Sequence, residues 1–537
     1  MIAVLFLVLC LRFTQRTIDG WDPLAYLYAA ERLAEGRPFA FCHPYNHEIG
    51  PYFTMAGFNV GGGSTGCLYL NYPLGFPLVL LLAKWLLPMQ QAMLIVPAVF
   101  GALGAMVTYW LGRLLLGARA GLTAAILLAL APPYLQFSTS LWSDLPVTTM
   151  LLFGLAILVW ADRQIDHKRQ VMAGWLAGMM LGWAIFGRYS AAVFLLPVVA
   201  YLLAGRTLGS QLKSRLVRSL ALSLGLAFLG IAVFNTAFYG GPLKTPYSVE
   251  HGWYAWPKFS LQYAFGSSPV GSASLVAIVQ AVWEGYGPLI LVGFVGFLVS
   301  SPRLRVLMIS GVGVFVAFYG LYAFPARGIN ARFALPLLPL VALSISAGLW
   351  YVHRVPRWVT GIWRGIVGLI IAIVLVVPLP AAVGHLADRN QATRTYVENI
   401  LATVDVTELD AVILAYDAND AIAFYTGRIP FYYRRVQRPP DVPDTGIPYF
   451  EPTLVSAVTA LLNKGIPVYY LLESEPSYWD SYAILDRNFR LNPVTSESSL
   501  YRITQEQVLR LQSRFTSRPH NVQLPRLGGA GGSCPCC

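Results

Sequence analysis

The chain has 537 residues, of which 56% are hydrophobic and 12% charged, and its mean hydropathy is +0.57. This composition excludes a soluble globular protein and predicts a polytopic α-helical membrane protein. The formal net charge of +12 would suit nucleic-acid binding, but the Lys and Arg residues lie mainly in short loops between apolar runs, where the positive-inside bias puts them. We therefore expect membrane lipids as partners and no nucleic acid.

About eleven apolar runs are candidates for membrane-spanning helices. They cover residues 2–13, 92–116, 121–137, 145–161, 170–187, 189–205, 219–239, 275–300, 306–324, 333–352 and 365–383. The first run is short for a span, so either its helix continues past a snorkelling Arg12 or the true start codon lies upstream; we favour the upstream start.

Basic loops alternate with loops that hold few or no Lys and Arg residues, which assigns the basic set to the cytoplasm. The loops around Asp144 and Arg188, residues 239–286 and residues 325–332 then face outward, as does everything after residue 383. The basic set is Arg113 and Arg119; Arg163, Lys168 and Arg169; Arg206, Lys213, Arg215 and Arg218; Arg303 and Arg305; Arg354, Arg357 and Arg364.

A large outer loop is expected between the first two spans, over residues 14–91. Its segment 71–88 is apolar, but a span there would reverse the charge alternation. Three prolines and Lys84 favour a helix that lies in the outer membrane interface. Cys42 and Cys67 share this loop and are equally able to form a disulfide, in an oxidising compartment, or to stay free.

The composition becomes that of a soluble domain after residue 383, and residues 384–520 are predicted to form a small α/β domain. DAVILAY, PVYYLLE and SLYRI have the pattern of strands, and PTLVSAVTALLNKG that of an amphipathic helix with a glycine cap. No glycine-rich phosphate loop follows any of these strands. Residues 521–537 form a Gly-rich tail whose cysteines lack C-x-x-C spacing, and we expect it to be disordered.

The outward side collects charged residues at the ends of apolar runs, where each lone charge costs about 2.5 to 3.5 kcal/mol to insert. We expect them to converge on one cavity at the outer interface. Arg327 and Arg332 flank a predicted helix start, where a cation opposes the helix dipole, so an anionic partner is favoured. The set comprises Asp19, Asp22, Lys84, Asp144, Arg188, Glu284, Arg327 and Arg332.

Simpler explanations exist for several of these charges. Asp22 precedes Pro23 and could be a helix N-cap, and Asp144 also precedes a helix. A cap does not require the second acid at Asp19. Arg188 lies between two apolar runs and could simply mark a loop, and the sequence offers no argument for or against a role of Glu284.

Several motifs, in this order, resemble those of the GT-C superfamily of membrane glycosyltransferases. The likeness spans roughly residues 1–350 and is strongest to the branch that holds protein O-mannosyltransferases and the aminoarabinose transferase of lipid A. The motifs are D-x-x-x-Y at Asp22 and Tyr26, A-x-x-L-A-x-G at residues 30–36, YPLGFPLVLLLA at 72–83, GRLLLGARA at 112–120, TAAILLALAPP at 123–133, Asp144, and ARFALPLLPL at 331–340.

This resemblance implies an inverting transferase that takes a sugar from a polyprenyl-phosphate carrier outside the membrane. It maps the catalytic base, or electrostatic partner of the acceptor, onto Asp22. It also implies a lysine near the carrier phosphate on the interfacial helix, where Lys84 lies. The family's D-E pair is replaced here by Asp22-Pro23, so the second acid is Asp19 or Asp144. The expected location is the cytoplasmic membrane of a prokaryote, with the active site and the C-terminal domain extracytoplasmic.

The residues fit this chemistry by themselves. A carboxylate can take the proton of an acceptor hydroxyl, for which Asp22 is the first candidate. Cations can stabilise the departing phosphate, and the candidates are Lys84, Arg188, Arg327 and Arg332. Tyr26 and Tyr72 could stack on the sugar, with Glu284 as a further substrate-binding candidate.

Three points stay open at this stage. The acceptor could be a lipid, a glycan or a protein. A divalent ion could bridge Asp22 and Asp144, although no ligand spacing demands one. The alternative function is that of a secondary transporter or lipid flippase, but such folds show internal repeats and mid-membrane charges, and we detect neither.

Overall fold

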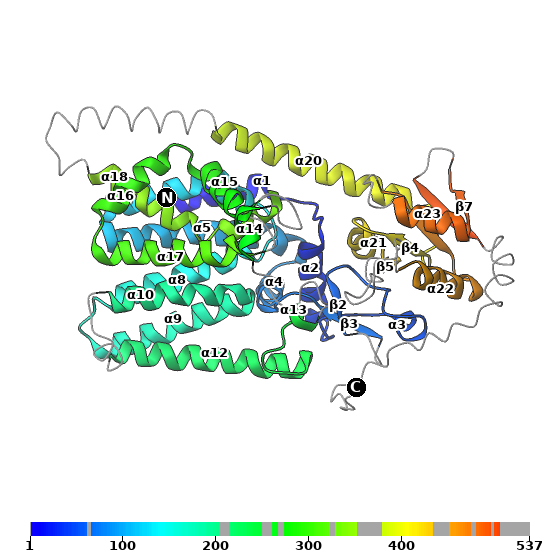
Figure 1. The fold of residues 1–537 in the computed structure, drawn as a ribbon, viewed down its shortest axis with the longest axis horizontal. Helices are drawn as coiled ribbons and strands as arrows, with labels where there is room; N and C mark the ends of the chain where they lie inside the picture. Colours follow the sequence, from blue (N-terminus) through cyan, green and yellow to red (C-terminus); the bar gives the residue numbers. More distant parts are fainter. Residues whose placement is uncertain are drawn as a thin grey trace.

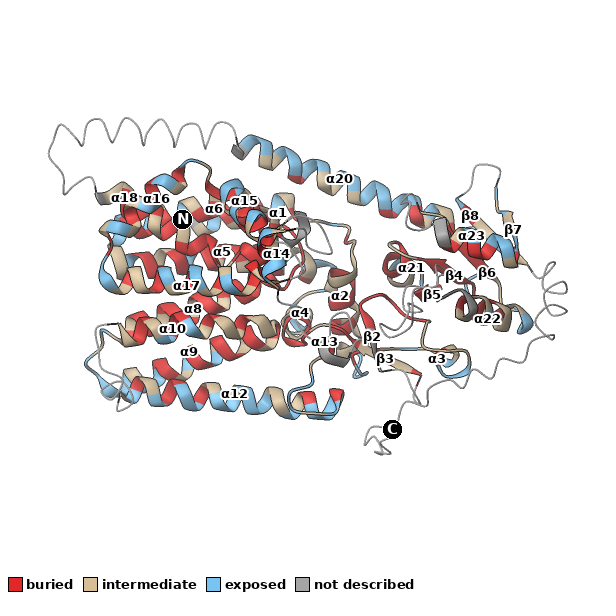
Figure 2. Ribbon diagram, in the orientation of Figure 1, coloured by how far each residue is buried: buried red, intermediate tan, exposed pale blue. Residues whose placement is uncertain are grey.

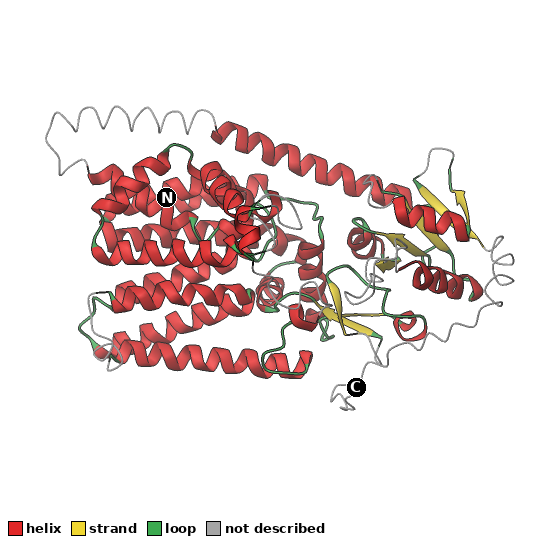
Figure 3. Cartoon of the chain, viewed as in Figure 1, coloured by secondary structure: helices red, strands yellow, loops and turns green. Residues whose placement is uncertain are grey.

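The structure is a computed structural model that describes residues 2–61, 66–204, 214–249, 260–266, 273–322, 328–351, 378–432, 450–473, 479–495 and 499–504. In these ranges a bundle of helices is joined to a smaller α/β domain by the long helix α20 (Pro378–Val404), and a layer of short elements lies between them (Figure 1). The strands gather in this layer and in the C-terminal domain, outside the bundle (Figure 3). Arg327, the cysteines of the tail and most of the predicted span 365–383 lie outside the described residues.

Five described helices are long and apolar enough to cross a membrane, or up to seven if each of two bent pairs counts as one span. The five are α5 (Met89–Leu116), α8 (Asp144–Ala161), α9 (His167–Gly187), α12 (Arg215–Tyr239) and α17 (Pro302–Gly320). Buried residues lie between the helices, while α12 exposes apolar side chains such as Leu229 and Val233 (Figure 2). An apolar exposed face suits contact with lipid, so the protein is a multi-pass membrane protein, as its composition predicted.

Two runs that were predicted as single spans are bent helix pairs rather than continuous helices. Residues 121–137 fall in α6 (Ala118–Leu130) and α7 (Pro132–Ser138), which meet at 70°. Residues 275–300 fall in α15 (Ser274–Tyr286) and α16 (Leu289–Val299), which meet at 97°. Prolines at the breaks remove a backbone donor, and Gly287 between α15 and α16 has a positive φ of 49°.

Three further predicted spans are shorter than a bilayer requires. They are α1 (Ile2–Phe13), the pair of η1 (Tyr189–Phe194) and α10 (Leu195–Leu203), and α18 (Leu338–Tyr351) after η2 (Gly328–Ala334). The 3₁₀ turn η1 directly follows the predicted site residue Arg188, and the 3₁₀ turn η2 contains the predicted site residue Arg332. The helical path is therefore interrupted where the charged residues enter it. Two short helices complete this part of the chain, α13 (Pro246–Val249) and α14 (Leu261–Phe265).

The outer loop folds into a compact layer rather than an open loop. It contains α2 (Trp21–Ala34), β1 (Ala40–Cys42), α3 (Pro44–Glu48), β2 (Phe58–Gly61), β3 (Cys67–Leu70) and α4 (Gly75–Leu86). The strands form an antiparallel sheet in the order β1-β3-β2. Cys42 and Cys67 are opposite each other in this sheet and form a disulfide, which answers the question that the sequence left open.

Helix α4 corresponds to the segment predicted to lie in the membrane interface. It has only 12 residues and packs against α2 and α5. Its C-terminal end exposes Trp85 and Leu86 beside the partly buried Lys84. An exposed Trp beside a cation is typical of the interface between lipid and water, so the interfacial position remains our prediction.

The C-terminal domain has the strands and the helix that its sequence predicted. A five-stranded mixed sheet has the order β5-β4-β6-β8-β7, in which β4 pairs in parallel with β5 and β6, and β8 is antiparallel to β6 and β7. Its elements are β4 (Val412–Ala415), α21 (Asn419–Thr426), β5 (Ile429–Tyr432), α22 (Phe450–Asn463), β6 (Val468–Leu471), α23 (Trp479–Asn488), β7 (Arg490–Pro493) and β8 (Leu500–Thr504).

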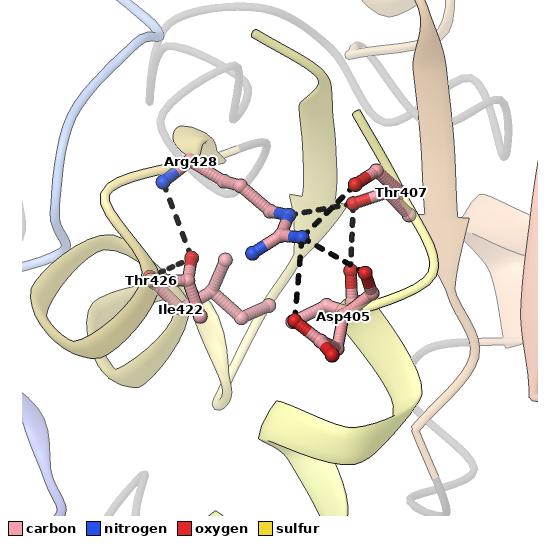
Figure 4. A network of polar contacts seen from close by, with 6 residues as sticks. Asp405, Thr407, Ile422, Thr426 and Arg428 are labelled. Atoms are coloured by element: carbon pink, nitrogen blue, oxygen red, sulfur yellow. Dashed lines mark hydrogen bonds and ion pairs between the residues drawn. The ribbon is translucent and has the colours of Figure 1, made fainter. Parts of the chain in front are cut away.

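A buried arginine fixes the junction between α20 and this domain. Arg428 donates from Nε to Thr407 Oγ1 at 2.7 Å and from Nη2 to the carbonyl oxygens of Thr407 at 2.9 Å and Asp405 at 3.3 Å. These acceptors directly follow α20, so one side chain holds the end of the helix against the start of β5 (Figure 4). Charge-assisted hydrogen bonds of this kind are stronger than neutral ones, and the junction is therefore firmly held.

The C-terminal domain docks through α21 on the layer of short elements formed by residues 14–91. Asp420 is fully buried and accepts a hydrogen bond of 2.5 Å from the backbone N–H of Ala56. The Tyr425 hydroxyl accepts from the N–H of Ile18 at 2.9 Å and donates to its carbonyl at 2.8 Å. Trp21 packs edge-on against Tyr416, with ring centroids 5.6 Å apart. The first residue of α2 is thus held by the C-terminal domain.

The docking contact of Asp420 predicts a dependence of stability on pH. Burial raises the pKa of Asp420 to about 7, so the folded protein retains a proton that the unfolded chain loses near pH 4. Stability should then fall as the pH rises from about 4 to 7, by at most about 1.4 kcal/mol per pH unit from this group. In thermal unfolding of the purified protein, Asp420→Asn should flatten this slope. The exposed Asp486→Asn is the control, and an unchanged slope in Asp420→Asn would contradict the assignment.

Candidate active site

The site forms where four segments meet at one end of the bundle. Asp144 is the first residue of α8 and Arg188 directly follows α9, so the antiparallel pair α8 and α9 brings both to the same end. Asp22 lies in the first turn of α2, and Arg332 lies in η2. Asp22 and Arg332, the first and last of these residues in the chain, are more than three hundred positions apart in the sequence, and only the tertiary fold brings the four together.

Their side chains form an alternating row of charges. Nη1 of Arg332 lies 3.0 Å from Oδ2 of Asp22, and Nε of Arg332 lies 3.7 Å from Oδ2 of Asp144. Asp144 Oδ1 in turn accepts a hydrogen bond from Arg188 Nη1. The side chains of Asp144 and Arg332 are only 5% and 11% exposed, so each charge is compensated mainly by its neighbours rather than by water.

Helix termini add to this balance of charge. Both carboxylates lie in first turns, of α2 and α8, where the helix dipole favours an anion, and Arg188 follows the C-terminus of α9, where it favours a cation. Neither carboxylate is a side-chain cap: the cap residues are Gly20 and Ser143, and neither position shows a side-chain cap hydrogen bond. The capping explanation therefore does not account for Asp22 or Asp144.

The guanidinium of Arg332 retains hydrogen-bonding capacity. Its Nε and Nη1 atoms are buried and make ion pairs, but no hydrogen bond satisfies either nitrogen, and Oδ2 of Asp144 is likewise unsatisfied. The guanidinium stacks over Trp142, with its carbon 4.0 Å from the ring centroid. A buried cation with free donors beside a planar ring is well suited to bind an anionic oxygen.

Tyr26 lies one helix turn after Asp22, and its hydroxyl is hydrogen-bonded to the Ser143 hydroxyl at 3.2 Å. Its ring is buried and packs edge-on against Tyr72 and Phe76, with both centroid distances 5.2 Å. Both predicted aromatic residues are therefore near the site. The Tyr26–Ser143 bond also ties the second turn of α2 to the residue before Asp144.

The sequence did not point to three aromatic residues that line the site. Phe333 lies under the Arg188 guanidinium, 4.7 Å from its carbon, and stacks on Tyr319. Tyr247 of α13 is close enough to Arg188 to interact with it electrostatically. Aromatic residues are frequent throughout this chain, so an aromatic residue by itself does not indicate a site. Phe333 alone of the three could have been selected from the sequence, because it is next to Arg332.

Two adjoining cavities extend from the row of charges. One small cavity is lined by Asp144 and Arg188 together with Ser190, Tyr319 and Phe333, among others. A second, larger cavity is lined almost entirely by apolar side chains of α8, α9, α10, α17 and α18. Leu151, Phe194 and Pro336 line both. A polar end therefore continues into an apolar groove.

Gly75 explains how α4 approaches the site so closely. A Cβ atom at Gly75 would lie 2.5 Å from the backbone nitrogen of Gly187, the last residue of α9 before Arg188. No side chain fits there, so the two backbones touch. The start of α4 thereby supports the end of α9, from which Arg188 extends.

Three predicted site residues lie outside the row of charges. Asp19 faces the C-terminal domain, where Asp417 and Tyr396 interact with it electrostatically. Lys84 interacts electrostatically with Glu31, which lies near the C-terminal end of α2, whereas Asp22 lies near its N-terminal end. Glu284 is exposed on α15. The structure thus brings together Asp22, Asp144, Arg188 and Arg332, with Tyr26 and Tyr72 beside them.

The described residues do not fit a divalent-metal site. Among them, no group of three or more His, Cys, Asp and Glu side chains could hold a metal ion. Arg332 forms ion pairs with both Asp22 and Asp144, so a guanidinium already compensates these two carboxylates.

Comparisons with known proteins agree with the geometry. Residues 73–234 match the family described as dolichyl-phosphate-mannose-protein mannosyltransferase. The crystal structure of ArnT from Cupriavidus metallidurans bound to undecaprenyl phosphate is similar, with a TM-score of 0.58, 13% identity and coverage of 94% of this chain and 96% of ArnT. No curated protein sequence matches the chain.

An oligosaccharyltransferase gives the second structural likeness. The enzyme from Archaeoglobus fulgidus in the apo form has a TM-score of 0.57 and 16% identity, over 90% of this chain and 71% of its own. The structure of the oligosaccharyltransferase AglB from Archaeoglobus fulgidus in complex with an inhibitory peptide and a dolichol-phosphate has a TM-score of 0.56 and 13% identity, over 94% of this chain and 74% of its own. ArnT and the archaeal enzyme are GT-C glycosyltransferases.

The chain has the GT-C fold. The resemblance of its sequence motifs to that superfamily is confirmed by these matches. In this GT-C fold, the row of charges begins in the first turn of α2, the helix that contacts α21 of the C-terminal domain.

The row of charges predicts how the GT-C fold responds to the loss of its central acid. Asp144→Asn leaves two guanidinium groups facing a neutral amide, so the free energy of unfolding should fall by about 3–5 kcal/mol. Adding Arg188→Gln should restore part of this loss because it removes one uncompensated cation. Thermal unfolding in detergent measures both variants. The exposed Asp166→Asn should cost about 1 kcal/mol or less, and an equal cost at Asp144 would contradict the charge balance.

Proposed function

We propose that this protein is an inverting glycosyltransferase that moves a sugar from a polyprenyl-phosphate donor to an acceptor hydroxyl. The proposed place is the outer side of the cytoplasmic membrane of a prokaryote. The observation that carries the proposal is a buried row of two carboxylates and two guanidinium groups at the end of an apolar groove. A lipid-linked phosphate has the matching shape, with an anionic head on a long apolar tail.

In this proposal the donor phosphate binds between Arg188 and Arg332 and its polyprenyl chain occupies the apolar groove. Support comes from the unsatisfied nitrogens of Arg332 and from the overlap of the two cavities at Leu151, Phe194 and Pro336. The similar structures of ArnT and of the archaeal oligosaccharyltransferase were determined with undecaprenyl phosphate and a dolichol-phosphate.

The reaction exchanges one bond at the anomeric carbon. The acceptor oxygen attacks from the face opposite the phosphate, and the bond between C1 and the phosphate oxygen breaks with its electron pair leaving on the phosphate. The acceptor hydroxyl proton passes to the Asp22 carboxylate. Arg188 and Arg332 compensate the negative charge that develops on the departing phosphate.

The ion pair of Arg332 with Asp22 links the proposed base to the proposed donor site. The Asp22 carboxylate lies 3.0 Å from the guanidinium. A donor phosphate that binds the same guanidinium competes with Asp22 for it and frees the carboxylate to contact the acceptor hydroxyl. Tyr26 and Tyr72 are the proposed contacts of the sugar, and the acceptor is a lipid, a glycan or a protein.

Purified protein incubated with a radiolabelled polyprenyl-phosphate sugar and membrane acceptors tests the proposal. We expect Asp22→Asn to lower donor consumption by about 10²- to 10⁴-fold, because the amide cannot accept the proton. Thermal unfolding should show that the variant is folded. Asp19→Asn separates the two neighbouring acids: activity should persist, because Asp19 faces the C-terminal domain. No consumption by the wild-type protein, or full activity of Asp22→Asn, would contradict the function.

The groove makes a separate prediction about donor length. Leu155 is buried on α8 and lines only the apolar cavity, so Leu155→Trp should narrow the groove and raise the KM for a long polyprenyl donor about 10-fold. A short-chain donor should be affected less. Met179→Trp, on the exposed face of α9, is the matched control. Equal effects on long and short donors would place the polyprenyl chain elsewhere.

A further inference from the structure

One arginine of helix α20 donates several hydrogen bonds to the bundle. Nη1 of Arg389 donates to the Ser140 hydroxyl at 2.6 Å and to the Gln136 carbonyl at 3.4 Å. Its Nη2 donates to the Thr139 hydroxyl at 3.2 Å and to the Thr139 carbonyl at 3.5 Å. All of these acceptors are neutral oxygens at the C-terminal end of α7, where the helix dipole favours a cation.

The neighbouring residue holds a second segment of the bundle. Nδ2 of Asn390 donates to the carbonyl of Phe13, the last residue of α1, at 2.7 Å. The backbone N–H of Gln15 donates to the carbonyl of Thr139 at 3.0 Å. Arg389 also donates to Oδ1 of Asn390 at 3.1 Å. The ends of α1 and α7 and the side of α20 therefore form one hydrogen-bonded junction.

This junction lies just before both carboxylates of the site. Ser140 is followed by Trp142, which stacks on Arg332, and then by Asp144. Gln15 leads through a short connection to α2, in whose first turn Asp22 lies. The contacts of Arg389 and Asn390 thus fix the starts of the two segments that lead to Asp22 and to Asp144. The distance between these segments decides whether Arg332 can contact both carboxylates.

The other end of α20 is equally fixed. Arg428 binds the residues that directly follow this helix and holds them against the C-terminal domain (Figure 4). Between these two anchors α20 is an uninterrupted helix, Pro378–Val404. The C-terminal domain and the two loops of the site are therefore held by one rigid element.

We infer that Arg389 is a positioning residue for the glycosyl transfer, and that it sets the distance between Asp22 and Asp144 by binding the ends of α1 and α7 from α20. The inference rests on the proposed function. Arginine suits this task because its planar group donates to several acceptors at once, whereas lysine offers a single point charge. Small displacements of reacting groups cost large factors in rate, so a change at the junction should act on turnover.

The test compares Arg389→Gln and Arg389→Lys with the wild-type protein in the donor-consumption assay. We expect Arg389→Gln to lower kcat about 10- to 100-fold while the KM for the donor stays within about twofold, because the groove and Arg188 are untouched. Arg389→Lys should be intermediate, because it keeps the charge at the end of α7 and loses most of the hydrogen bonds. Arg394→Gln is the matched control: Arg394 lies on the same helix, is exposed, and pairs only with Glu398 at 2.7 Å among the described residues.

The outcomes separate the inference from the function on which it rests. A wild-type protein that consumes no donor overturns the proposed function and the inference with it. Donor consumption by the wild type with the same kcat in Arg389→Gln and Arg394→Gln overturns the inference alone, as does a KM that rises in step with a falling kcat. If Arg389→Gln does not fold, Arg389→Lys decides: a kcat equal to that of the wild type overturns the inference, and a lower kcat at unchanged KM and unfolding temperature supports it.

Discussion

The position of Arg332 between Asp22 and Asp144 is the constraint on which the rest of the site depends. With Arg188 the four charges sum to zero, so they can lie together in a largely buried place at the end of a membrane bundle. Any one of them alone would be costly there. The same arrangement leaves donors of Arg332 without hydrogen bonds, so the cluster is compensated in charge but still able to bind an anion.

Interruptions of the helices are what bring these charges together. α6 and α7 bend by 70° just before the segment that carries Asp144, and η2 replaces a regular helix around Arg332. In an unbroken helix the charged residue would lie within the membrane-spanning part of the bundle. A break lets the helix end near the site, so that the charged residue lies at the helix end. Proline and glycine at the breaks supply the local cause.

The C-terminal domain is part of the construction of the site. Trp21, directly before Asp22, packs against Tyr416 of this domain, and Tyr425 binds the backbone of Ile18. α20 reaches the opposite side of the same region through Arg389. The segment that carries the proposed base is therefore held from two directions, by contacts that are hundreds of residues away in the sequence.

The sequence alone determined the membrane class, the α/β domain and the GT-C resemblance, because apolar periodicity and motif order are local properties of a chain. It also predicted one site from eight charged residues, and four of them, Asp22, Asp144, Arg188 and Arg332, meet in the structure. Only the tertiary structure decided which charges meet: Asp19, three positions from Asp22, faces another domain, whereas Arg332 reaches it from far along the chain. Charge and loop position indicate which side of a membrane a residue occupies. The direction in which its side chain points, and its distance from other charged side chains, depend on how the helices pack.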